Sequence, residues 1–318
     1  MISCRHRHAS KHSPKGGRTL PTHHRPALIR TTNNVFPPDL FQQFPDRPIF
    51  ACDFYVQGIE NGEELPGGYR LGAIVNVDHH APTPRMVRPI SSANLAIAHV
   101  RDAGPAADDA AIVLNHTDCD SVLSGAIVAG LLPADPMFGD AAIAADHTGD
   151  ANEIADLLQS LEHPRDLDCS LRNLYLLLSG QPLEQPVAAR VTARLRRREA
   201  AAELVHRGSF TRIGAVDLAL PPEHMEGEFF APLMPTAVVI MLATPMEQDP
   251  SRWRIKLRLG QAAPAGLTLH RLLAGLDSGY GGRWNAGSNH RGGGTALEPE
   301  VYARRLARRV DELVAGGG

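Results

Sequence analysis

The sequence predicts an α/β protein, in which a domain built on a parallel sheet with helices on both faces is followed by a smaller α/β domain. The length of 318 residues exceeds the usual size of one domain, and 43% hydrophobic residues suffice for two cores. In the first part, unbroken apolar runs alternate with helical stretches, as in sheets that helices cover on both faces. After Gly208 the pattern changes, so we place a boundary near residue 207.

Four apolar runs are the predicted strands of the first domain. None of them alternates between polar and apolar residues, which favours strands that are buried on both faces. The strands are expected at 48–53, 71–78, 110–115 and 140–146. The helices are expected at 91–103, 121–132 and 151–161, the last with Asp150 as its N-cap.

A long basic helix is predicted over 185–206, where it would bridge the two domains. Beyond it we expect strands at 212–220, 237–243 and 253–259, a helix at 268–276, a Gly-rich loop at 279–294 and a final helix at 299–314. Pro299 suits the first turn of that last helix. The chain then divides into a disordered tail at 1–45, a first domain at 46–184, the linker helix at 185–207 and a second domain at 208–318.

The charge is distributed unevenly along the chain. The net charge is −3, but residues 1–30 hold seven basic and no acidic side chains, so the remainder carries 25 basic against 35 acidic ones. An acidic body argues against a nucleic-acid coat or a processive nuclease. The basic tail contains five histidines that either bind a metal or are simply solvated: His6, His8, His12, His23 and His24.

Cysteine usage and hydropathy favour a cytoplasmic protein. The four cysteines, Cys4, Cys52, Cys119 and Cys169, form no CxxC pair, so neither a disulfide framework nor a thiolate zinc site is expected. No apolar run approaches the roughly 20 residues that span a bilayer. The basic N-terminal stretch lacks an apolar core, so no Sec signal and no membrane partner are expected.

Acidic and imidazole side chains follow all four predicted strands. They are Asp53, the run Asp78-His79-His80, the run 116–121 (HTDCDS) and the run 146–150 (DHTGD). Because the carboxyl ends of parallel strands meet at one edge of a sheet, we expect these groups to lie together. So many carboxylates would repel one another without a cation, and carboxylate with imidazole suits Mn²⁺, Fe²⁺, Co²⁺ or Zn²⁺. The number of ligands suffices for two ions. We interpret His99, His147 and Asp150 instead as a helix-face residue, a neighbour and a cap.

These motifs resemble those of a known family, the DHH phosphoesterases. Asp78-His79-His80 after a buried strand resembles the family signature, and His116–Ser121 resembles the first motif of the RecJ-like branch. Ala144–Gly149 is similar to the strand end that supplies the last metal ligand, and Asp53 is similar to the single aspartate of the second motif. The order differs from that of the family, because the segment like the first motif follows the DHH strand. The resemblance is therefore to a permuted arrangement.

The C-terminal part is similar to the small DHHA1 domain that accompanies DHH domains. The resemblance rests on the run 255–258 (IKLR), His270 and the run 280–287 (YGGRWNAG). In that domain a Gly-rich loop grips the substrate phosphate, since glycines let the backbone approach an anion closely. The resemblance, with the donors of the predicted loop, implies these substrate-binding residues: Arg258, Gly281, Gly282, Arg283, Asn285, Gly287, His290 and Arg291.

The resemblance also implies roles for the acidic cluster. One ion would be held by His116, Asp118 and Asp53, and a second by Asp120, Asp53, His79 and Asp146, with Asp53 as the bridge. The catalytic pair would be Asp78, which orients its neighbouring imidazole, and His80, which contacts the scissile phosphate. We expect two Mn²⁺ ions, with Mg²⁺, Co²⁺ or Zn²⁺ as alternatives.

The function expected from the sequence is that of a metal-dependent phosphoesterase, an exonuclease-like hydrolase acting on a short oligonucleotide or a small nucleotide. Two alternatives stay open: a pyrophosphatase-like phosphoanhydride hydrolase, and a protein that binds nucleotides without catalysis. The arginines of the 185–206 helix either line a groove or form a solvated face. A homodimer is left open.

Overall fold

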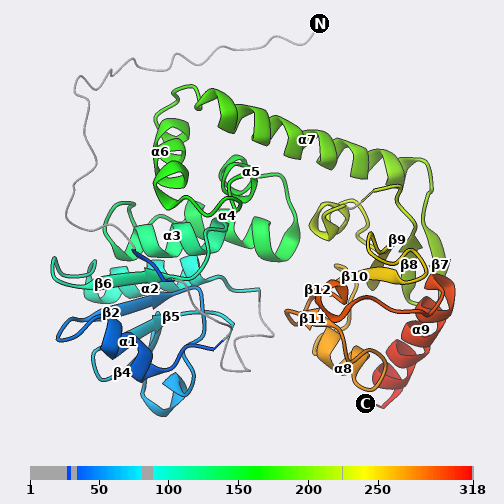
Figure 1. Cartoon of the computed structure of the whole chain (residues 1–318), viewed down its shortest axis with the longest axis horizontal. Helices are drawn as coiled ribbons and strands as arrows, with labels where there is room; N and C mark the ends of the chain where they lie inside the picture. The colour runs from blue at the N-terminus through cyan, green and yellow to red at the C-terminus, as the bar shows by residue number, and fades with distance from the viewer. Residues whose placement is uncertain (1–26, 30–33, 81–88, 224, 317–318) are drawn as a thin grey trace, which may run out of the picture.

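The chain forms a mixed α/β structure with two six-stranded sheets. The computed structural model describes residues 27–29, 34–80, 89–223 and 225–316. Figure 1 shows the two sheets side by side, with the long helix α7 (Gln185–His206) running from the helices of the first half to the second half. The predicted span of this helix is confirmed.

The first sheet is mixed rather than wholly parallel. Its strand order is β1-β6-β2-β5-β4-β3. The parallel part consists of β1 (Ala27–Leu28), β6 (Ala111–Leu114), β2 (Ile49–Cys52) and β5 (Ile74–Val77). At one edge, β4 (Gly68–Leu71) pairs antiparallel with β5, and β3 (Glu63–Leu65) pairs antiparallel with β4. The expectation of a purely parallel sheet is therefore wrong at this edge, where a short hairpin replaces a crossover.

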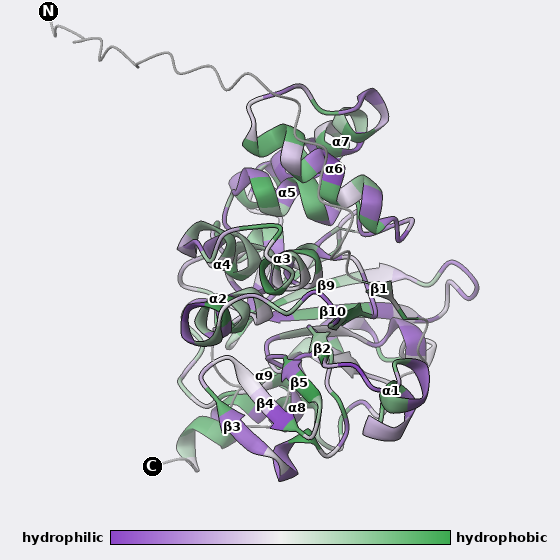
Figure 2. Ribbon diagram, turned by 90° about the vertical axis from the view of Figure 1, so that its left-hand side faces the viewer, coloured by the Kyte–Doolittle hydropathy of each residue, from purple (hydrophilic) through white to green (hydrophobic). Residues whose placement is uncertain are grey.

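Alternate residues of the first sheet enter two different cores. Phe50 and Cys52 pack with the larger helical layer, whereas Ile49 and Ala51 pack on the other side. The larger layer contains α2 (Ser92–Ala103), α3 (Cys119–Val128), α4 (Pro136–Ile143), α5 (Glu153–Ser160) and α6 (Leu167–Leu178). The opposite core holds α1 (Pro37–Gln43) and the 3-10 turn η1 (Ile59–Asn61). In Figure 2, α3 is largely hydrophobic while the β3–β4 hairpin is hydrophilic.

The segment 140–146, which we expected to be a strand, is helical. It forms the end of α4 and the start of a π-helical turn, η2 (Ala144–Thr148). Asp135 caps α4 through its side chain, and Pro136 occupies the first turn. The error has a physical reason: periodicity cannot distinguish a short apolar run in a buried strand from one in a buried helix, and alanine favours the helix.

The tail expected at 1–45 is partly structured. Residues 27–28 form the edge strand β1, and residues 37–43 form α1 with Leu40 in the core. The expectation of disorder is wrong for these stretches, whose local sequence lacks an apolar period because so few of their residues reach the core. The basic and histidine-rich residues 1–26 lie outside the described part of the chain.

The second sheet has the order β11-β12-β10-β9-β8-β7 and is antiparallel except for the β8–β9 pair. Its strands are β7 (Thr211–Ile213), β8 (Val216–Ala219), β9 (Val239–Pro245), β10 (Trp253–Leu259), β11 (Gly281–Gly282) and β12 (Ala286–Ser288). The helical elements are η3 (Gly227–Phe230), α8 (Leu269–Leu273), η4 (His290–Gly292) and α9 (Pro299–Ala315). The strand expected at 212–220 is split into β7 and β8 at Gly214, whose φ of +57° turns the chain.

Helix α7 is anchored through arginines that the sequence left open as a groove or a solvated face. Arg194 is 4% exposed, and its Nε donates to Asp156 Oδ1 over 3.0 Å. Arg198 donates to the same oxygen and to the carbonyl of Gly149. Both guanidinium groups lie over the ring of Phe229, 4.7 and 4.6 Å from its centre. These two arginines therefore join α7, α5 and η3 rather than face solvent.

In the described part of the chain, no helix combines the length and apolarity needed to cross a membrane.

Candidate metal centre

The acidic and imidazole groups gather at the carboxyl ends of β2, β5 and β6. Asp53 follows β2 directly, the Asp78-His79-His80 run follows β5, and His116 to Asp120 lead from β6 into α3. Asp146 comes from the π-helical turn η2 instead of a strand end. The three strand ends are close together because their strands are parallel neighbours, as the sequence predicts.

Asp53 lies at the centre of the cluster and is fully buried. Its backbone has φ of +59°, a conformation that aspartate tolerates better than most residues. Ser92 Oγ donates to its Oδ1 over 2.8 Å, and Ser121 Oγ donates to its Oδ2 over 2.7 Å. These hydroxyls fix the carboxylate so that its two oxygens face different neighbours.

The first group of close donor atoms contains Asp53, His116 and Asp118. His116 Nε2 lies 3.1 Å from Asp53 Oδ2 and 3.2 Å from Asp118 Oδ2. Asp118 also caps α3, because its Oδ1 accepts from the backbone N–H of Ser121. One oxygen of Asp118 thus stabilises the helix while the other faces His116.

The second group contains His79, Asp120 and Asp146. His79 Nε2 lies 3.5 Å from Asp120 Oδ2 and 3.6 Å from Asp146 Oδ2, and it is also 3.6 Å from Asp53 Oδ1. The other ring nitrogen, Nδ1, donates to the carbonyl of Ile90 over 2.6 Å, so Nε2 carries a lone pair. His79 Nε2 is buried without a hydrogen-bond partner.

Two further contacts complete the cluster. The oxygens of Asp120 accept from the backbone N–H groups of Ser92 and Ala93, each over 2.7 Å, at the first turn of α2. Asp78 Oδ1 lies 2.7 Å from His80 Nδ1, so Asp78 orients the second histidine of the run. His80 belongs with Asp53 and His79 to a third group of close donor atoms.

The arrangement fits divalent cations. Ligand atoms about 2.1 Å from one ion lie about 3 Å apart when they are adjacent in an octahedral shell. The first-group separations of 3.1 and 3.2 Å match this value, and the second-group separations of 3.5 and 3.6 Å are slightly longer. A lone pair on a buried imidazole that faces three carboxylates is unfavourable unless a cation lies between them. Structural zinc sites usually contain thiolates, which are missing from this donor set. Its carboxylate and imidazole donors instead suit Mn²⁺, Co²⁺, Mg²⁺ or a catalytic Zn²⁺.

Burial and mutual repulsion perturb the pKa values in the cluster. Burial and the negative charges of Asp53 and Asp146 hold the pKa of Asp120 well above its usual range. Burial opposes ionisation of Asp53 too, but the hydrogen bond and charge of His116 lower its pKa. Although burial disfavours the charged form of His116, Asp118 and Asp53 raise its pKa to about 11. In the absence of a metal ion, the raised pKa values of Asp120 and His116 therefore favour protons on these two groups.

The second sheet contributes Arg283 to the same place. This residue follows β11 at the tip of the β11–β12 hairpin, where its backbone N–H donates to the carbonyl of Ala286. Its guanidinium forms an ion pair with Asp146 and lies 3.8 Å from Asp118 Oδ2. Of the predicted substrate-binding residues, Arg283 is the one that pairs directly with the acidic cluster.

Arg258 also reaches the first half, but it binds the backbone. Its Nη2 donates to the carbonyl of His147 over 2.7 Å and lies 3.3 Å from that of Asp146. The side chain is only 4% exposed. The structure thus places Arg258 as a link to the turn η2, while its Nε is buried without a hydrogen-bond partner.

The predicted glycines shape the hairpin. A Cβ on Gly282 would lie 2.4 Å from the carbonyl oxygen of Ala286, and one on Gly287 would lie 2.5 Å from that of Gly281. The close pairing of β11 with β12 therefore requires these glycines. His290 and Arg291 follow the opposite end of β12 from the tip and are exposed, so the structure does not bring them to the cluster.

Four residues beside the site were not predicted as site residues. Ser92 and Ser121 orient Asp53, and only their places in the first turns of α2 and α3 could have hinted at this. His147, which we interpreted as a mere neighbour, lies with its ring centre 5.6 Å from that of His79. Burial lowers its pKa to about 4, and its Nε2 donates to the carbonyl of Ile90. The ring centre of Trp284 lies 6.3 Å from that of His147.

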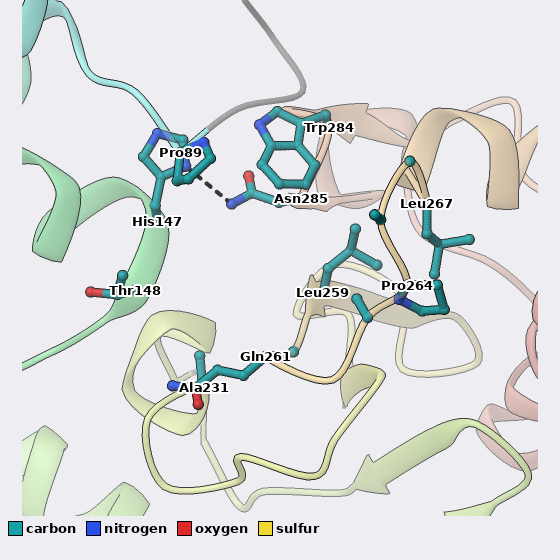
Figure 3. Close-up of a pocket in the computed structure, with 14 residues that line it drawn as sticks. Pro89, His147, Thr148, Ala231, Leu259, Gln261, Pro264, Leu267, Trp284 and Asn285 are labelled. Carbon is teal, nitrogen blue, oxygen red and sulfur yellow. Dashed lines mark hydrogen bonds between the residues drawn. The ribbon is translucent and has the colours of Figure 1, made fainter.

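A pocket of about 370 Å³ opens beside the cluster, between the two halves of the chain. Its polar residues include His147, Asn285 and Gln261, and its apolar residues include Trp284 and Leu259. In Figure 3, the side chains of Trp284 and Asn285 face the cavity from one side, with Leu259, Pro264 and Leu267 on the other.

Comparisons with known proteins assign no family. No family model and no curated protein matches the sequence. Among solved structures, the chain is similar to the pGpG-specific phosphodiesterase PggH from Vibrio cholerae, with 12% sequence identity and a TM-score of 0.43. The match covers 68% of this chain and 88% of that one. At this distance the likeness transfers no activity, so the function must rest on the residues of this chain.

Proposed function

We propose that the protein is a metal-dependent phosphoesterase that hydrolyses phosphodiester or phosphomonoester bonds of small nucleotides or short oligonucleotides at a site for two cations. One observation supports this most directly. The two oxygens of Asp53 face two different sets of donors, with His116 on one side and His79 on the other. A carboxylate in this position suits two neighbouring ions, which is the arrangement that hydrolytic two-metal sites use.

The residues that would hold the cations follow from the donor groups. Asp53, His116 and Asp118 would hold one, and Asp53, His79, Asp120 and Asp146 the other. When bound, such a pair of ions activates water at neutral pH and stabilises the charge that develops on the phosphoryl oxygens. In hydrolysis a water oxygen forms a new bond to phosphorus, the bond to the ester oxygen breaks, and that oxygen leaves as an alcohol after gaining a proton.

The chain itself positions the reacting groups. Ser92 and Ser121 fix Asp53, and the carbonyl of Ile90 fixes the ring of His79, so these side chains are preorganised. His80, oriented by Asp78 and 28% exposed in its side chain, would contact the scissile phosphate. The guanidinium of Arg283, beside Asp146 and Asp118, supplies positive charge that would attract an anionic substrate.

The pocket beside the cluster favours an organic phosphoester over inorganic pyrophosphate. Pyrophosphate has no apolar part, whereas this cavity is lined by Trp284, Leu259, Pro264 and Leu267. The acidic body of the chain also argues against long nucleic acids, because it would repel their phosphates. A small nucleotide or a short oligonucleotide satisfies both conditions.

The test is hydrolysis of a substrate panel with and without Mn²⁺. The panel contains short RNA, linear and cyclic dinucleotides, 3′-phosphoadenosine 5′-phosphate, bis-p-nitrophenyl phosphate and pyrophosphate. We expect Mn²⁺-dependent cleavage of a nucleotide ester that a chelator abolishes and that Asp120→Asn reduces at least a hundredfold. An exposed neighbour, Asp150, supplies the control variant Asp150→Asn. Unchanged hydrolysis by the Asp120 variant would refute the assignment.

A further inference from the structure

The pocket of Figure 3 has features of a binding site that the metal cluster does not explain. Asn285 is 5% exposed, and its Oδ1 is buried without a hydrogen-bond partner. Its Nδ2 already lies 3.5 Å from His147 Nδ1, whereas its Oδ1 can still accept a hydrogen bond. A buried amide oxygen without a donor costs free energy unless a ligand supplies one.

The walls of the pocket suit a flat aromatic ring. Trp284 lies on one side, and the aliphatic side chains of Leu259, Pro264 and Leu267 lie on the other. Indole faces stack on heterocycles regardless of their exact identity, while apolar walls exclude water. The cavity of about 370 Å³ is within the usual range for small-molecule sites.

The pocket is next to the metal cluster. His147 and Trp284 line it, and the same two residues border a small cavity shared with His79, His80 and Arg283. The ring centres of His79 and His147 are 5.6 Å apart, and those of His147 and Trp284 are 6.3 Å apart. A ligand ring against Trp284 would therefore lie next to the cluster, as the base of a nucleotide lies next to the phosphate that its sugar carries.

We propose that this pocket binds a nucleobase of the substrate, with the base stacked on Trp284 and one of its N–H groups donating to Asn285 Oδ1. The inference rests on the proposed function and names its substrate class. It predicts a preference for bases with an exposed N–H donor, because an analogue without it would leave the Asn285 oxygen unpaired. Gln261, at the rim of the pocket, supplies a further polar group.

Intrinsic fluorescence isolates this site, because the chain contains only two tryptophans. Trp253, in β10, lines neither cavity, so a Trp253→Phe variant leaves Trp284 as the single reporter. With Mn²⁺ present, we expect AMP to quench this fluorescence saturably and ribose 5-phosphate, which lacks a base, to bind at least tenfold more weakly. Equal binding of the two ligands, or no quenching by AMP, would overturn the proposal.

A second comparison tests the Asn285 contact. N6,N6-dimethyl-AMP keeps the aromatic ring but has no N6–H donor, and we expect it to bind at least about fivefold more weakly than AMP. In the variant Asn285→Leu this difference should vanish, while equal affinities in the parent protein would exclude the contact.

Catalysis separates failure of this inference from failure of the proposed function. If the protein cleaves a dinucleotide and a counterpart without bases at the same kcat/KM, the phosphoesterase proposal stands and the base pocket is wrong. If it cleaves neither, yet AMP quenches Trp284, the pocket stands and the phosphoesterase proposal is wrong. For the Trp284→Ala variant we expect the ratio of the two kcat/KM values to fall at least tenfold.

Discussion

Arg283 and Asp146 form an ion pair that joins the two halves of the molecule. The guanidinium comes from the tip of the β11–β12 hairpin, and the carboxylate comes from the π-helical turn η2. Burial opposes ionisation of Asp146, but Arg283 outweighs this effect and lowers its pKa. The arginine thus occupies one carboxylate oxygen of the acidic cluster, for which it would compete with a cation.

This competition predicts a measurable effect of Arg283→Ala on metal binding. Because the substitution frees Asp146 Oδ2, the Kd for Mn²⁺ should fall roughly fivefold or more in isothermal titration calorimetry. The KM for a nucleotide substrate should rise, since the variant loses a positive charge beside the cluster. Arg304→Ala, on the surface of α9, is the control and should change neither value. Weaker Mn²⁺ binding in the Arg283 variant would contradict the competition.

Asp53→Asn should disable the site without unfolding the protein. Asparagine accepts the positive φ of this position about as well as aspartate does, so the backbone should be retained. Loss of the shared charge should lower both the Mn²⁺ stoichiometry in metal analysis and the hydrolysis rate, the latter at least a hundredfold. The melting temperature without metal should fall by no more than a few degrees, because the attraction to His116 is lost while the repulsion with Asp120 is relieved. Full Mn²⁺ occupancy in this variant would show that Asp53 is not a shared ligand.

Mn²⁺ should stabilise the native protein. A ligand that binds only the folded state raises stability by about 2.7 kcal/mol at a hundredfold excess over its Kd. Differential scanning calorimetry should therefore show a higher melting temperature with Mn²⁺ than with a chelator. The increase should be absent from Asp53→Asn, whereas an equal increase in that variant would place the ion elsewhere.

Asp156 should be important for stability, because it is the carboxylate that compensates two arginines of α7. Its Oδ1 accepts from Arg194 Nε and Arg198 Nη2, and the Asp156 and Arg194 side chains are each 5% exposed. Replacing it by alanine removes the hydrogen-bonded carboxylate from both arginines and leaves Arg194 only its 3.6 Å contact with Glu228, so we expect a loss of about 3 kcal/mol in urea unfolding. Glu312→Ala removes an exposed ion pair with Arg309 and should cost well under 1 kcal/mol. Similar losses in the two variants would contradict the burial argument.

Glu228 should make stability depend on pH in the acidic range. Burial raises its pKa, but Lys256, Arg258 and Arg194 outweigh burial and hold it below the ordinary value of 4.5. A lowered carboxyl pKa stabilises the fold above the unfolded-state value, and this contribution is lost as the pH falls through the folded-state pKa. The parent should therefore exceed Glu228→Gln in unfolding free energy at pH 7, and the difference should narrow below about pH 4.5. A difference that does not change with pH would exclude this role.

The strand ends that carry the site were predictable because the signal is local. Unbroken apolar runs followed directly by Asp53, by Asp78-His79-His80 and by the run 116–121 indicate buried strands with ligands at their carboxyl ends. The spans of α7 and β10 are likewise set by sequence periodicity and were predicted to the residue. For Asp146 the prediction of proximity holds, although its segment is a helix and not a strand.

Residue types and local patterns thus determined the buried strands, the long basic helix and the inventory of carboxylates and imidazoles. Only the tertiary structure decided which groups meet. It places Ser92 and Ser121 on Asp53, turns Arg194 and Arg198 inward, and brings Arg283, Trp284 and Asn285 to the first half. These pairings join residues far apart in the chain. They depend on how two separately formed cores pack, and no local periodicity encodes that contact.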